Sequence, residues 1–210
     1  EEEVIDLLEG KIMQAEETTY EKMDEMFFGD GTGNSNKNFN GLQNLVSIND
    51  AGAFATVGGI EASAQAWWRP KRDAVAEVLS IAKMTSMYNS ASVGNDRPNV
   101  ILTTQALFEK YESLLQPQLR FADTKSADAG FQNLLFKGAP VTYDTYCPTG
   151  YMYGLNTKYL RLTGHRDVWW KPTPFVRPEN QDARYAQILV YGELCISNRA
   201  RQFVMSGKTA

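Results

Sequence analysis

The first clear pattern in the sequence is a stripe of apolar and small residues between Ile5 and Met26. Residues three or four positions apart lie on one face of an α-helix, and the remaining positions of this segment are mostly charged. The pattern predicts an amphipathic helix from Glu1 to about Phe27, roughly 40 Å long at the usual helical rise. Such a helix must lie along another part of the chain or along a neighbour. Its inner stripe comprises Ile5, Leu8, Ile12, Ala15, Thr19, Met23 and Met26.

Turn-forming residues from Gly29 to Asn34 end this helix, and a loop is expected to Asn40. The apolar runs at residues 42–48 and 57–60 predict two short strands. A second helix is expected at residues 71–90, and its inner stripe would comprise Val75, Val78, Leu79 and Ala82.

The second half of the chain alternates short apolar runs with turn residues. Residues 99–102 predict a buried strand, which Thr103-Thr104 would link to a helix ending near Leu115. Further strands are expected at residues 134–136, 139–143, 151–155, 159–162, 168–170 and 185–195. Helices come first and strands dominate later, so the predicted class is α+β.

Composition and charge narrow the choice of function. The chain has 210 residues, 43% of them hydrophobic, and a formal charge of −4. An acidic protein is a poor ligand for nucleic acid, whose phosphates need clustered cations. Two short basic runs, Arg69-Pro70-Lys71-Arg72 and Arg199-Ala200-Arg201, are interpreted as solvated faces or ion-pair partners. No apolar stretch reaches the length of a membrane span and no signal segment is present, so a cytoplasmic protein is expected.

The sequence offers little catalytic chemistry. His165 is the only histidine, and the two cysteines, Cys147 and Cys195, lack the spacing of a metal site. A hydrolase or transferase using Cys147 with His165 is the enzyme alternative, and it requires an activated thiolate. We predict no catalytic residue, no cofactor and no metal.

Other candidate motifs favour structural roles. The Gly29 to Gly33 run follows a helix and lacks a terminal Gly-Lys-Ser/Thr, so it does not match a phosphate-binding loop. A calcium loop fails at Ser35 and Gly41, where Gly and Glu are required. Within each of the pairs Trp67-Trp68 and Trp169-Trp170, one ring is expected in the core. The scattered carboxylates form no acid and base pair and are interpreted as ion-pair partners: Asp123, Asp128, Asp167, Asp182 and Glu193.

Several stretches, taken in order, resemble the major capsid proteins of tailed bacteriophages over nearly the whole chain. They are Val57-Gly58-Gly59-Ile60 with Trp67-Trp68-Arg69, residues 97–104, Tyr111-Glu112, residues 118–121, residues 130–141, and residues 155–160. The resemblance implies an α+β coat-protein fold with two domains. A peripheral domain, built on a long spine helix and a long-stranded sheet, would comprise residues 1–66 and 166–210. An axial domain, a mixed sheet flanked by helices, would comprise residues 67–165.

The resemblance also implies a function. The protein would be a structural subunit of an icosahedral phage or prophage capsid, assembling with itself into hexamers and pentamers that enclose the genome. Further partners would be a scaffolding protein, a head protease and a portal, with no sequence-specific nucleic-acid binding and no membrane. Assembly would take place in the bacterial cytoplasm. An encapsulin-like shell protein is the alternative within the same fold. The family's N-terminal arm and extended loop have no counterpart here, and the start at Glu1 suggests an N-terminally truncated chain.

Overall fold

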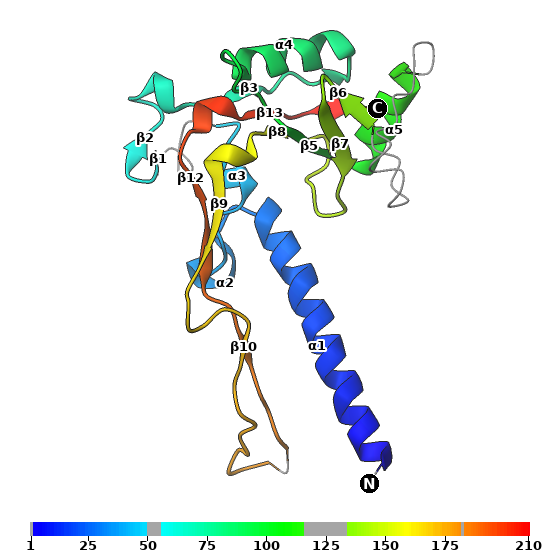
Figure 1. Ribbon diagram of the computed structural model, residues 1–210, viewed down its shortest axis with the longest axis vertical. Helices are drawn as coiled ribbons and strands as arrows, with labels where there is room; N and C mark the ends of the chain where they lie inside the picture. The colour runs from blue at the N-terminus through cyan, green and yellow to red at the C-terminus, as the bar shows by residue number, and fades with distance from the viewer. Residues whose placement is uncertain (1, 50–55, 116–133, 182) are drawn as a thin grey trace.

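The computed structural model describes residues 2–49, 56–115, 134–181 and 183–210. Its N-terminal element is the helix α1 (Glu2–Phe28), which projects from the rest of the molecule (Figure 1). The predicted helix from Glu1 to about Phe27 is therefore confirmed within a residue. Among the side chains described in this helix, Phe28 at the C-terminal end is the one buried in the core.

The centre of the molecule is a mixed six-stranded sheet with the order β3-β13-β8-β5-β7-β6. The pairs β3–β13 and β5–β7 are parallel and the others antiparallel. The strands span β3 (Lys71–Asp73), β5 (Val100–Thr103), β6 (Leu134–Phe136), β7 (Ala139–Tyr143), β8 (Met152–Leu155) and β13 (Phe203–Met205).

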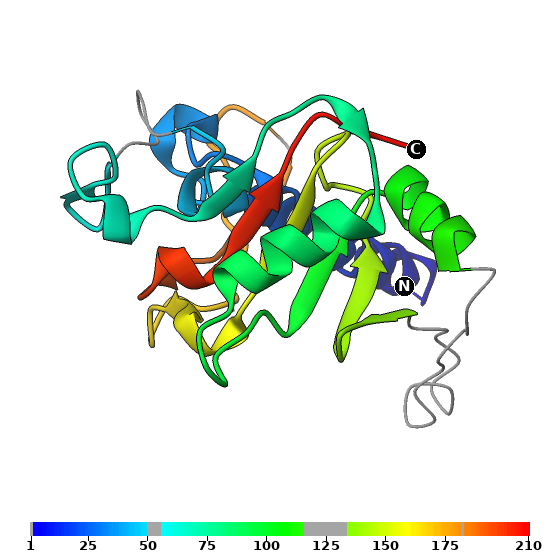
Figure 2. The ribbon, with the colours of Figure 1, turned by 90° about the horizontal axis from the view of Figure 1, so that it is seen from above.

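Buried side chains along these strands point alternately to the two faces of the sheet, so a hydrophobic core lies on each face. On one face, Met152 and Phe203 pack with α4 (Ile81–Ala91) and α5 (Gln105–Leu115). On the other face, Tyr153 and Val204 pack with α3 (Leu42–Leu45) and the end of α1. Successive side chains of a strand point to opposite faces, so both faces are covered. Figure 2 shows α4 lying across the sheet.

A long two-stranded arm leaves the sheet beside α1 (Figure 1). Its base is the antiparallel pair β9 (Leu160–Gly164) and β12 (Gly192–Ile196). Farther out, β10 (Lys171–Pro172) pairs with β11 (Ile188–Leu189). Outside the arm and the central sheet, a small hairpin consists of β1 (Thr56–Val57) and β2 (Ile60–Glu61). The short helices are α2 (Gly33–Asn36), η2 (Ala66–Trp68), η3 (Thr157–Tyr159) and η4 (Arg199–Arg201).

Five predictions of secondary structure are wrong, those for residues 42–48, 57–60, 71–90, 168–170 and 185–195. Residues 42–48 contain the helix α3, because Leu42, Leu45 and Val46 have helical spacing and are buried together. The helix predicted at residues 71–90 begins only at Ile81, after the Ser80 N-cap. The segment before it forms β3 and β4 (Glu77–Val78), because the C-terminal strands β13 and β14 (Lys208–Thr209) pair with it.

Two further corrections concern the arm. The strand expected at residues 185–195 is divided into β11 and β12, and no strand forms at residues 168–170. Trp170 instead has a positive φ of 55°, which is incompatible with an extended strand. The strand predicted at residues 57–60 is instead a hairpin, because Gly58 and Gly59 have positive φ and form the turn between β1 and β2. The other strand predictions are confirmed within a few residues, and so is the unit of β5 followed by α5.

Candidate functional site

The proposed Cys147 and His165 pair lacks the features of a catalytic dyad. Cys147 is buried beside the sheet, where its thiol lies 3.7 Å from the carbonyl oxygen of Tyr151. Burial, assisted by Asp144, raises the pKa of Cys147 to about 12, the opposite of the shift that an activated thiolate needs. His165 is exposed on the arm, and its Nδ1 accepts a hydrogen bond from the Asp167 backbone. Among the described residues, no hydrogen bond joins Cys147 to His165.

The Gly29 to Gly33 run forms a local turn. The Asp30 carboxylate accepts hydrogen bonds from the backbone N–H and the hydroxyl of Thr32, and these bonds lower its pKa. The following residues, Asn34 to Asn36, have positive φ angles of 49°, 58° and 62°, so α2 is a left-handed turn. In the part of the chain that the structure describes, no group of three or more potential ligands is placed to hold a metal ion.

The predicted carboxylates lie apart. Glu193 accepts a hydrogen bond of 2.7 Å from the Asn40 backbone, which ties the base of the arm to the loop after α1. Asp167 lies on the exposed turn next to His165. Asp123, Asp128 and Asp182 lie outside the described residues, as do the motifs at residues 118–121 and 130–133.

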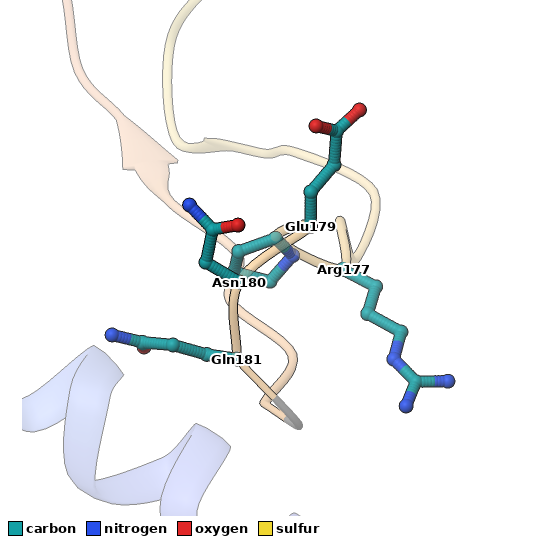
Figure 3. A pocket seen from close by; sticks show the side chains of 5 residues that line it. Arg177, Glu179, Asn180 and Gln181 are labelled. Carbon is teal, nitrogen blue, oxygen red and sulfur yellow. The ribbon is translucent and has the colours of Figure 1, made fainter.

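The tip of the arm is hollowed but shows no site. Its concave turn is formed by residues 177–181. Figure 3 shows the side chains of Arg177, Glu179 and Gln181 pointing in different directions, so they do not converge on a ligand. We assign no binding role to this turn.

An apolar groove separates α1 from the arm. It has a volume of about 660 Å³, and its apolar lining includes Ile12, Tyr20, Trp170, Phe175 and Ile188. The Tyr20 and Trp170 rings bridge it, with centroids 4.5 Å apart. The predicted inner stripe of α1 is accordingly half-buried near Met23 and Met26 but exposed at Ile12 and Ala15. Among its described members, from Ile12 to Met26, the stripe is half-buried only toward the end of the helix; the side chains of Ile5 and Leu8 lie outside the description.

The two tryptophan pairs differ in burial. Trp68 is buried while Trp67 is 62% exposed, which confirms the prediction for this pair. Trp169 and Trp170 are both half-buried in the arm, so neither provides the core ring expected there.

The fold brings together the two basic runs that are far apart in the sequence. Parallel pairing of β3 with β13 places Lys71 opposite Phe203, and the Lys71 N–H donates to Gln202 at 3.0 Å. We call Arg69, Lys71, Arg72 and Arg201 the basic edge. Lys71 and Arg72 are exposed, as predicted.

Arg199 departs from the prediction of a solvated side chain. It is fully buried, and its guanidinium donates to the carbonyl oxygens of Leu45 at 2.8 Å and Asn44 at 3.3 Å. It therefore holds α3 on the sheet and is not part of the basic edge.

The main surface features of the described residues are a projecting helix, an apolar groove and a basic edge. None of the helices in the described part of the chain combines the length and the apolar character that crossing a bilayer demands.

This architecture matches a solved viral structure. The chain is similar to a chain of the cyanophage A-1(L) capsid asymmetric unit, with a TM-score of 0.71 and 19% sequence identity. The match covers 98% of this chain and 69% of that chain. Identity this low shows the fold alone, and that fold is the one of a phage capsid subunit. No family model and no curated protein matches the sequence.

Proposed function

We propose that the protein is a structural subunit of an icosahedral phage or prophage capsid. The main observation that supports this proposal is the structural similarity to the cyanophage capsid chain, which extends over 98% of this chain. The surfaces are consistent with this role, because a projecting helix and arm with exposed apolar side chains suit contact with other subunits. In this role the protein acts by assembling with itself. Identical chains join by heterologous contacts into hexamers and pentamers, which form a shell around the genome in the virion.

The proposal includes the division of the chain into two domains. Residues 1–66 and 166–210 form the peripheral domain, supported by the position of α1 beside the arm (Figure 1). Residues 67–165 form the axial domain, supported by five of its strands lying in the central sheet. The sixth strand, β13, comes from the C-terminal segment and ties the two parts together.

Assembly of the natural gene product tests the function. Purified from a bacterial host, it is expected to form capsomer rings or closed shells visible by negative-stain electron microscopy. Co-expression with candidate scaffolding, head-protease and portal proteins would identify its further partners. A gene product that stays monomeric in all these conditions contradicts a capsid role. Shells enclosing protein cargo in place of nucleic acid would favour the encapsulin-like alternative.

A further inference from the structure

The charges of the chain are divided between α1 and the remainder. Residues 1–28 contain ten carboxylates and two lysines, a formal charge of −8, whereas residues 29–210 carry +4. The net negative charge of the molecule therefore lies on the segment that forms the projecting helix (Figure 1). Opposite charges held on separate parts of one molecule favour contact between copies.

The outer face of α1 carries an acidic row. Glu17, Glu21 and Glu25 follow one another at four-residue steps, opposite the apolar stripe, and all three are exposed. Like charges at this spacing repel each other along a helix. Lys22 compensates part of the repulsion through its ion pair with Glu25 at 2.6 Å. Glu17 forms no ion pair within the described part of the chain, so a cationic partner would relieve the row further.

The basic edge is similar in length to the acidic row, although Lys71 and Arg72 are successive strand residues whose side chains point to opposite faces of the sheet. Arg69 is held by hydrogen bonds of 2.6 Å to the carbonyl oxygens of Ala62 and Ser63, and Lys71 and Arg72 follow on an extended strand. The extended segment from Arg69 to Arg72 is roughly 10 Å long, and the acidic row from Glu17 to Glu25 is roughly 12 Å long. The two charged rows are therefore similar in length.

Exposed apolar side chains accompany both rows. Trp67, two residues before the basic edge, is 62% exposed. Met13 and Tyr20, beside the acidic row, are 58% and 63% exposed. An aromatic anchor surrounded by charged residues is typical of protein interfaces. The two surfaces cannot meet within one chain, because α1 projects away from the edge of the sheet that carries β3 (Figures 1 and 2).

We propose that the basic edge of one copy, together with Trp67, binds the acidic row of α1 on a second copy. The contact is heterologous, so each copy offers one surface to each of two neighbours, as a ring requires. This inference rests on the proposed capsid function and identifies the surfaces that would join its subunits. Cations on an edge strand also prevent sheets from pairing edge to edge, a role compatible with this one.

Charge reversal on each surface tests the proposal. The variants are K71E/R72E, E17K/E21K and the two combined, and self-association is measured by sedimentation velocity at about 0.05 M and about 0.5 M salt. Each pair of reversals should weaken association about tenfold at low salt, and much less at high salt. The combined variant should recover to within about threefold of the wild type, because both charge patterns are then exchanged.

The control is R166E/K171E, which makes the same charge change at exposed positions of the arm and should leave association nearly unchanged. If the wild type assembles and K71E/R72E assembles equally well, the inference is overturned while the capsid function stands. A combined variant no better than either parent also overturns it. The same holds if K71E/R72E loses affinity for a DNA fragment without any change in association. A wild type that never associates contradicts the capsid function itself.

Discussion

Gly154 lies in the middle of β8, paired with Phe203 of β13. A Cβ atom at this position would overlap the Phe203 ring, which is fully buried and has no room to move. Gly154→Ala should therefore lower the free energy of unfolding by about 1–3 kcal/mol. Gly10→Ala is the matched control, because a Cβ there meets nothing in the exposed helix and should stabilise α1 by about 1 kcal/mol. Urea denaturation measures both, and equal effects would contradict the packing described here.

Lys208 is a buried cation at the C-terminal end. Its ammonium lies 3.2 Å from the Asp73 carboxylate, 2.9 Å from Glu77 and 2.7 Å from the Val75 carbonyl oxygen. Lys208→Met should cost on the order of 3 kcal/mol at neutral pH, because it leaves Asp73 largely buried without this partner. Lys158→Met removes an exposed pair with Asp96 and should cost under about 1 kcal/mol. Similar losses in thermal denaturation would contradict the importance of burial.

The Lys208 cluster also predicts a pH dependence. Burial tends to raise the pKa of Asp73, but the Val75 N–H, Lys208 and Lys83 outweigh it, and the pKa lies below its ordinary value. The pKa of Glu77 is lowered by its hydrogen bonds to Lys208 and Lys83. Depressed carboxyl pKa values stabilise the folded state above about pH 4, and this stability is lost as the pH falls through the folded-state values. The stability difference between wild type and Lys208→Met should therefore shrink as the pH falls below about 4, as denaturation midpoints would show.

Among the elements, the arm has a specific stabilising device. Gly164 and Gly192 face each other across the β9–β12 pair, and a Cβ on either would collide with the Trp169 ring. The ring therefore lies over a pair of glycines and replaces the side-chain contacts that they lack. Trp169→Ala should accelerate hydrogen exchange at His165 and Tyr191, whose backbone N–H groups close this part of the arm, by roughly tenfold or more. Trp67→Ala, at an exposed ring, should leave that exchange unchanged.

The sequence predicted local elements well and distant pairings poorly. The length of α1, the β5 and α5 unit and the strands β6 to β8 follow from periodicity and turn residues close to them. The strands β3 and β4 form because β13 and β14 pair with them from about 130 positions away, and no local pattern records that partner. Val75 and Val78 were predicted to be buried, yet each is 54% exposed.

At the scale of the molecule, the sequence indicated the class of function but not its surfaces. The family resemblance and the lack of candidate catalytic residues suggested a capsid subunit, and the fold is similar to that of a phage capsid chain. The basic edge escaped prediction, because the pairing of β3 with β13 assembles it from two runs about 130 residues apart. The acidic character of α1 was visible in its composition. A binding role for this helix could be proposed only after the structure showed a basic surface elsewhere on the molecule.

The two halves of the molecule should differ in stability before assembly. The central sheet has a buried core on each face, whereas Ile12 and Met13 of α1 are 42% and 58% exposed. A helix without a packed face is marginal on its own. In the unassembled chain, residues 9–18 should therefore exchange their amide hydrogens at least about a hundredfold faster than β8 and β13, which open only on global unfolding. Hydrogen exchange with mass spectrometry would measure this, and assembly should slow exchange in α1 selectively. Equal protection along the isolated chain would mean that α1 is held by contacts within its own subunit, which would remove the reason to expect a neighbour on it.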